Sequence, residues 1–214
     1  HHLSHCASAY YPSGFHNAAI LTIDGVGEWA TATIAYGKER SIEIKKELHF
    51  PHSVGLLYSS FTYFLGFKVN SGEYKLMGLA PYGHKNSIQV KHFMKLIKSE
   101  LVQINLDGSI WLNQNYFQYA TGLRMISAKK WEALFGFSRR KPESGIEHYH
   151  CNLALAIQLI TEDIVIKMAE EAKQLTGAEN LVMAGGVALN CSANGRLLRK
   201  GIFKEIFVQP AAGD

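Results

Sequence analysis

The sequence is poor in cysteine and has no long apolar run. Its 214 residues include three cysteines, Cys6, Cys151 and Cys191, which lie far apart and form no Cys-x-x-Cys pair. This pattern excludes a disulfide scaffold or a zinc ribbon, and it predicts three buried structural thiols in a reducing, cytoplasmic setting. No stretch approaches the roughly 20 apolar residues that a membrane-spanning helix needs, so we expect no membrane partner.

The sequence also lacks a strong excess of charge of one sign. Lys and Arg total 22 and Asp and Glu total 18, which gives a net charge of +4 with no run of five basic residues. Nucleic acid is therefore disfavoured as the main partner, because nucleic-acid-binding proteins concentrate Lys and Arg on one face. Hydrophobic residues make up 47% of the chain, which indicates a folded globular protein with a substantial core.

Apolar periodicity predicts an α/β fold. Three strands separated by tight turns, at about 18–23, 29–36 and 42–48, indicate an antiparallel meander. Helical spacing follows at about 54–65, 87–100 and 152–174. A strand at 180–184, a helix at 187–200 and a strand at 205–208 then predict a parallel strand–helix crossover.

The stretch from about 101 to 150 has no clear period. We expect irregular structure there, with Arg139, Arg140 and Lys141 in a solvated loop.

Four residues are candidate metal ligands. His1 and His5 are four apart, a spacing that places two imidazoles on one face of a helix. Asp24 and Asp214 each follow a strand-like segment and adjoin glycine, so their carboxylates would stand at strand ends. This set suits Fe²⁺, Mn²⁺ or Zn²⁺ with positions open for a substrate. The alternatives are two surface histidines, a turn-forming Asp24 and a frayed Asp214. The Glu of an HExxH peptidase is missing, which disfavours that class.

Two glycine segments are candidate nucleotide-binding elements. The Asp-Gly-Val-Gly turn that follows the first strand leaves room for a phosphate or a metal. The Gly-Gly that joins a strand to a helix lets a ligand approach the backbone, and the helix start offers N–H groups to an anion. Simple packing of a strand–helix turn is the alternative. The candidate residues are Gly25, Gly27, Gly185, Gly186, Val187 and Asn190.

Two charged residues lie in a third, glycine-rich segment at 71–83. Glu73 and Lys75 are included with Asp24 as candidate catalytic residues, because they would be able to orient a polar ligand. Their spacing alone favours an exposed ion pair worth under about 1 kcal/mol.

Long, ordered motifs cover nearly the whole chain, and only the stretch at about 84–145 contains none. The motifs are HHLSHCASAY at 1–10, TIDGVGEW at 22–29, FPHSVGLLY at 50–58, GEYKLMGLAPYG at 72–83, AGGVALN at 184–190 and QPAAGD at 209–214. Together they resemble the bacterial O-carbamoyltransferases of nodulation-factor and antibiotic biosynthesis.

This resemblance implies an actin-like ATPase (ribonuclease H-like) fold, related to the protein that makes the threonylcarbamoyl modification of tRNA. It implies that His1, His5 and Asp214 hold a metal, joined by Asp24, and that Gly185, Gly186 and Asn190 line the nucleotide. The implied cofactors are a divalent metal, Fe²⁺ before Mn²⁺ or Zn²⁺, and ATP or carbamoyladenylate, with Mg²⁺ as a further candidate.

The implied reaction has two stages. Carbamoyl phosphate and ATP give carbamoyladenylate in a second domain, and the carbamoyl group then passes to a hydroxyl of a sugar or antibiotic-like small molecule. The chain has no initiator methionine and ends directly after Gly213 with Asp214. We therefore expect residues 1–214 to be the central part of the actin-like domain, truncated at both ends, without the adenylate-forming domain and inactive alone.

Two alternative functions stay open, tRNA threonylcarbamoyl transfer and a non-catalytic metal- or nucleotide-binding module. The IDGVGEW and GEYKLMGLAPYG runs argue against the first. The acceptor and the oligomeric state are open, with a homodimer among the alternatives.

Overall fold

The computed structural model describes residues 1–213. They divide into two compact units, which are described separately. Unit 1 comprises 1–56, 105–110 and the chain from Glu162 onward, and unit 2 comprises 57–104 and 111–161. No helix formed by residues 1–213 is both long enough and apolar enough to cross a membrane.

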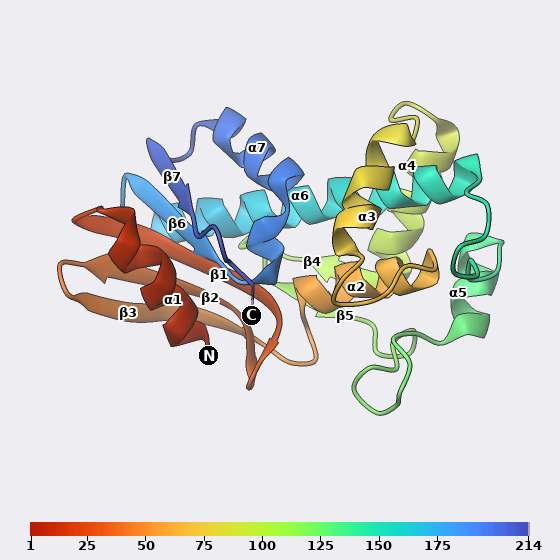
Figure 1. Ribbon diagram of the computed structural model, residues 1–214, viewed down its shortest axis with the longest axis horizontal. Coiled ribbons are helices and arrows are strands. Elements are labelled where there is room, and N and C mark those ends of the chain that lie inside the picture. The colour runs from red at the N-terminus through yellow and green to blue at the C-terminus, as the bar shows by residue number, and fades with distance from the viewer. Residues whose placement is uncertain (214) are drawn as a thin grey trace. The chain divides into compact units, whose positions relative to one another are not determined.

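A five-stranded sheet forms the centre of unit 1 (Figure 1). Its order is β3-β2-β1-β6-β7. The first three strands pair antiparallel in sequence order, whereas β6 pairs parallel with both β1 and β7. The meander and the parallel crossover predicted from the sequence are therefore both present. The strands are β1 (Asn17–Gly27), β2 (Ala30–Lys38), β3 (Ser41–His49), β6 (Asn180–Ala184) and β7 (Glu205–Val208).

Helices cover both faces of this sheet. On one face α1 (His2–Tyr10) packs its buried residues Cys6, Ala9 and Tyr10 against Ala18 and Ile20 of β1. Because side chains alternate along a strand, the next two even-numbered positions of β1, 22 and 24, continue this face. The other face is covered by the second half of α6 (His148–Thr176), and α7 (Cys191–Lys200) connects β6 to β7.

Unit 2 is built mainly from helices around an aromatic core. The ring centroids of Phe61 and Trp131 lie 4.8 Å apart, and those of Phe64 and Trp131 lie 5.3 Å apart. Phe93 and Phe135 extend the same cluster with a centroid separation of 5.8 Å. The elements are α2 (Val54–Phe64), α3 (Glu73–Leu79), α4 (Ile88–Leu96), α5 (Ala128–Phe135) and the first half of α6, and a small sheet pairs β4 (Val102–Ile104) with β5 (Ile110–Leu112).

The prediction of irregular structure at 101–150 is correct only in part, because β4, β5 and α5 lie there, whereas no helix or strand covers 113–127 or 136–147. Residues 139–141 do lie in a loop and Lys141 is exposed, but the two arginines are held by the protein. Arg140 is buried, and its Nε donates to the Leu65 carbonyl at 2.6 Å. Nε of Arg139 donates to the Tyr63 carbonyl at 2.8 Å. Guanidinium donors thus bind carbonyls at and just after the C-terminal end of α2, where the Tyr63 carbonyl also accepts from the Gly66 amide at 3.1 Å.

The segment after Gly185 also differs from its prediction. A 3₁₀ turn covers Gly186–Leu189, and α7 begins only at Cys191. Cys191 is exposed at the start of that helix, so the prediction of a buried thiol is wrong there, whereas Cys6 and Cys151 are buried.

Candidate metal centre

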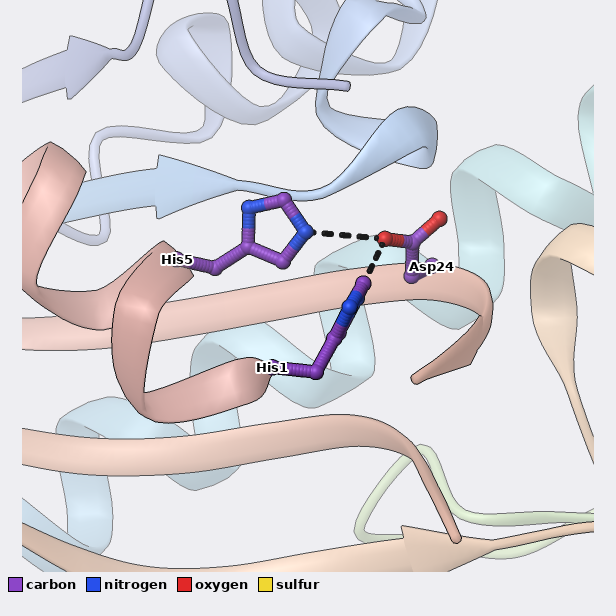
Figure 2. Close-up of side chains that lie close together, drawn as sticks. All are labelled: His1, His5 and Asp24. Atoms are coloured by element: carbon purple, nitrogen blue, oxygen red, sulfur yellow. Dashed lines mark hydrogen bonds and ion pairs between the residues drawn. The ribbon is translucent and has the colours of Figure 1, made fainter. Parts of the chain in front are cut away.

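Two histidines and an aspartate meet at the end of β1 (Figure 2). Nε2 of His1 lies 3.1 Å from Oδ2 of Asp24, and Nε2 of His5 lies 3.0 Å from the same oxygen. The three ligand-type atoms all lie within 4.8 Å of one another. Two imidazoles and one carboxylate are a donor set that binds Fe²⁺, Mn²⁺ or Zn²⁺, so these residues fit such an ion.

Local structure explains why these three side chains converge. His1 is the N-cap residue of α1 and His5 lies one turn further, so both imidazoles fall on the same side of the helix. Asp24 lies on the strand face that α1 covers, near the end of β1. They are three of the four ligands proposed from the sequence. The fourth, Asp214, lies outside the described residues.

Close backbone packing fixes the walls of the site. A side chain at Gly27 would overlap the imidazole of His1, so this position requires glycine. The Ser53 hydroxyl lies 2.6 Å from the Gly25 carbonyl and 3.1 Å from the Asp24 carbonyl. Its oxygen also accepts from the Leu56 amide at 3.0 Å and so caps the first turn of α2.

The second carboxylate oxygen of Asp24 faces the glycine segments. Oδ1 accepts from the Gly25 amide at 2.7 Å and from the Gly186 amide at 3.3 Å. Gly185 has a φ of +89°, and a Cβ there would overlap the Ile23 carbonyl. Four of the candidate nucleotide-binding residues, the glycines at 25, 27, 185 and 186, therefore surround the candidate metal ligands.

The remaining candidates of this segment lie further along. Val187 is half-buried in the 3₁₀ turn. The Asn190 side chain is buried and caps α7, where its Oδ1 accepts from the Ala193 amide at 3.0 Å. Gly213 lies against the 3₁₀ turn, because a Cβ built there would be 3.6 Å from Cδ1 of Leu189.

Glu73 and Lys75 lie in unit 2, on α3. The carboxylate of Glu73 accepts from the Ser59 hydroxyl at 2.8 Å and from the Asn70 and Gly72 amides, both at 3.1 Å. The ion pair with Lys75 expected from spacing is therefore not formed. The Glu73 carboxylate is used by these three donors, and residues two apart on a helix do not face each other.

Three residues that the sequence did not single out support the centre. His2 and Thr22 are buried beside it, and Ser53 holds the backbone of Asp24. Burial lowers the pKa of His2 below its ordinary value, against a smaller upward effect of its bond to the Ala30 carbonyl. The sequence contains one indication of the role of Thr22. It precedes Asp24 by two positions on the same strand, so both side chains lie on the same face.

The fold and the site define a mixed α/β protein with a His-His-Asp metal-type centre beside glycine-rich turns. A family model described as "Carbamoyltransferase N-terminus" matches residues 1–214. The chain therefore belongs to the carbamoyltransferase N-terminal family.

Several curated relatives match the whole chain. It is 53% identical over 214 residues to the Synechocystis protein sll1178, of which it covers 34%. It is 38% identical over 220 residues to nodulation protein NolNO of Sinorhizobium fredii, covering 29%, and 33% identical over 218 residues to NolO of Bradyrhizobium diazoefficiens, covering 36%. The chain thus spans about a third of the length of these relatives.

One solved structure with a weak overall likeness is component A of the Acidaminococcus fermentans (R)-2-hydroxyglutaryl-CoA dehydratase. The match has a TM-score of 0.37 at 14% identity and covers 97% of this chain and 61% of that one.

Proposed function

We propose that residues 1–214 form the metal site and part of the nucleotide site of an O-carbamoyltransferase. The observation that carries the proposal is the convergence of His1 and His5 on one oxygen of Asp24 in a chain of the carbamoyltransferase N-terminal family. The acceptor is a hydroxyl of a sugar or antibiotic-like small molecule. The sheet order and the glycine turns at 25–27 and 185–186 support an actin-like arrangement of this domain.

The proposed transfer forms one carbon–oxygen bond and breaks another. The acceptor hydroxyl oxygen attacks the carbonyl carbon of carbamoyladenylate, the bond between that carbon and the AMP phosphate oxygen breaks, and the hydroxyl proton passes to water. The products are a carbamate ester and AMP. Carbamoyladenylate arises from carbamoyl phosphate and ATP, with Mg²⁺ and with release of phosphate and pyrophosphate, in a domain outside these 214 residues.

The chain's own residues divide between two roles. His1, His5 and Asp24 would hold Fe²⁺, with Mn²⁺ or Zn²⁺ as the other candidates, and Asp214 is the proposed fourth ligand. Such an ion would polarise the carbamoyl carbonyl or the acceptor hydroxyl. Oδ1 of Asp24 accepts from the Gly186 amide, so the carboxylate also keeps the second glycine turn beside the ion. The Gly185–Asn190 segment and Gly25 would lie against the adenylate, because glycine lets a ligand approach the backbone closely.

The test is a carbamoylation assay of the full-length protein. It is incubated with carbamoyl phosphate, ATP, Mg²⁺, Fe²⁺ and a panel of hydroxylated acceptors, and mass spectrometry follows the gain of one carbamoyl group. We expect a carbamoylated product with the wild type and none with His5→Ala. The exposed His16→Ala is the matched control and should keep the activity. If the wild type binds the metal but carbamoylates no acceptor, the chain is a non-catalytic metal-binding module and the proposal fails.

A further inference from the structure

A chain of buried polar side chains begins at the residue between the two candidate histidine ligands. Nδ1 of His2 lies 2.6 Å from Oγ1 of Thr22, and its Nε2 lies 3.0 Å from the Ala30 carbonyl. Oγ1 of Thr22 lies 2.7 Å from Oγ1 of Thr33, its direct cross-strand partner. The chain ends at Cys6, whose Sγ lies 3.8 Å from the Thr33 hydroxyl.

The first residue of this chain uses both nitrogens of its ring. A carbonyl can only accept, so Nε2 of His2 carries the hydrogen that is shared with Ala30. The ring is 5% exposed, and its Nδ1 is bonded to the Thr22 hydroxyl. The Thr22 hydroxyl is bonded in turn to the Thr33 hydroxyl, which contacts the Cys6 thiol.

This chain joins three elements at the point where the metal centre is built. His2 belongs to the first turn of α1, Thr22 to β1 and Ala30 to β2. Thr22 precedes Asp24 by two residues, so the strand presents the partner of His2 and the candidate metal ligand on one face. The two bonds of His2 therefore set the register in which the first turn of α1 meets β1.

We propose that His2 is a positioning residue of the metal centre, and that its bonds to Thr22 and Ala30 hold His1 and His5 against Asp24. His2 itself binds no metal, because both of its ring nitrogens are used by the protein. The proposal rests on the metal site of the proposed function. Partners that orient ligands in this way contribute about 10–100-fold to metal affinity in other proteins.

The test removes the Thr22 hydroxyl while keeping its shape. Co²⁺ is titrated into the full-length protein without other metals, and its visible absorption band reports both affinity and coordination geometry. Thr22→Val leaves Nδ1 of His2 without its hydroxyl partner, so we expect Co²⁺ affinity to fall about tenfold or more, with an altered band. Thr22→Ser keeps the hydroxyl and should restore both the affinity and the band.

The matched control is Thr62→Val. Thr62 is also fully buried, but its hydroxyl donates to the Tyr58 carbonyl within α2, in unit 2. We expect wild-type Co²⁺ affinity and an unchanged band. If Thr22→Val does not fold, Thr33→Val removes the next hydroxyl of the chain and should show a smaller loss in the same direction.

A second readout needs no metal. NMR of the metal-free protein should show the His2 ring held against Thr22 and Ala30, and Thr22→Val should shift the signals of that ring. Wild-type Co²⁺ affinity and band in Thr22→Val would overturn the positioning role alone. A wild type that binds Co²⁺ no better than His5→Ala would overturn the metal site, and the positioning role with it.

Discussion

Two clusters of charged and ligand-type side chains in unit 1 differ in what they leave for a ligand. In one, Nζ of Lys46 lies 2.8 Å from Oδ2 of Asp107 and 2.8 Å from Oε1 of Glu171, so the chain itself supplies the cation. In the other, His1 and His5 share one oxygen of Asp24.

Among residues 1–213, the second cluster contains no Lys or Arg at its centre and instead brings three ligand-type atoms within 4.8 Å of one another. The first cluster is thus an ion-pair network that ties β3 to α6, whereas the second has a donor set that would fit a cation.

The pKa shifts of the lysine cluster fit a structural role. Burial would raise the pKa of Asp107, but its bonds to Lys46 and Ser109 outweigh burial and lower the pKa to about 2. The bonds to Asp107 and Glu171 raise the pKa of Lys46. Lys46 therefore stabilises the charged form of Asp107, and the two carboxylates stabilise the charged form of Lys46, which is how a salt bridge contributes to folding.

We expect the largest effect on metal content from variants of the histidine cluster. His5→Ala and Asp24→Asn each remove one of three ligands, so we expect stoichiometric Fe²⁺ or Mn²⁺ in the wild-type protein and loss of that metal from both variants. Elemental analysis of protein purified with the metal and then desalted measures this. Lys46→Met should keep the metal. Equal metal content in His5→Ala and the wild type would contradict the assignment.

A smaller effect comes from crowding the site. The Cβ of Gly27→Ala would overlap the His1 imidazole, so the ring must move away from Asp24. We expect about tenfold weaker Mn²⁺ binding, measured by titration calorimetry, because a displaced ligand behaves like a lost orienting contact. Gly78→Ala is the control, because a Cβ there meets no atom within 4 Å. Unchanged affinity in Gly27→Ala would show that His1 is not a ligand.

The lysine cluster should respond in stability and not in metal binding. Lys46→Met leaves Asp107 and Glu171 without their shared cation. The Lys46 side chain is 37% exposed, so screening limits the expected loss to about 1 kcal/mol of unfolding free energy. Urea denaturation measures the free energy, and elemental analysis should show wild-type metal content. A loss of metal in Lys46→Met would show that the two clusters are coupled, and it would contradict their separate roles.

The smallest effect is the pH dependence of that stability. The pKa of Asp107 is about 2 in the folded protein against 3.8 ordinarily. A lowered folded pKa contributes stability above pH 3.8 that is lost as the pH falls toward 2. The difference in unfolding free energy between the wild type and Asp107→Asn should therefore shrink as the pH falls from 3.8 to 2. Urea denaturation at a series of pH values checks this, and a constant difference would contradict the shift.

Much of the fold was predictable because its signals are local. Three alternating strands and the strand–Gly-Gly–helix segment have periods that depend only on near neighbours. The surroundings of Arg139 and Arg140 were not predictable, because they come from distant partners. Arg139 and Arg140 look solvated in sequence, and only the fold supplies the Tyr63 and Leu65 carbonyls that they bind.

Part of the candidate site was predictable because the signals of its ligands are also local. His1 and His5 carry a helical spacing and Asp24 ends a strand, so each could be found from its own neighbourhood. His2 could not, because its partners Thr22 and Ala30 lie 20 and 28 residues away. The predicted ion pair of Glu73 is absent because the Ser59 hydroxyl and the Gly72 amide use its carboxylate.

The most direct test of the central claim is anomalous X-ray diffraction from crystals of the full-length protein with Fe²⁺ or Mn²⁺. We expect one strong anomalous peak within bonding distance of Nε2 of His1, Nε2 of His5 and Oδ2 of Asp24. The same crystals show whether Asp214 provides a fourth ligand. A metal-loaded crystal with its peak elsewhere, or with no peak beside Asp24, would contradict the account.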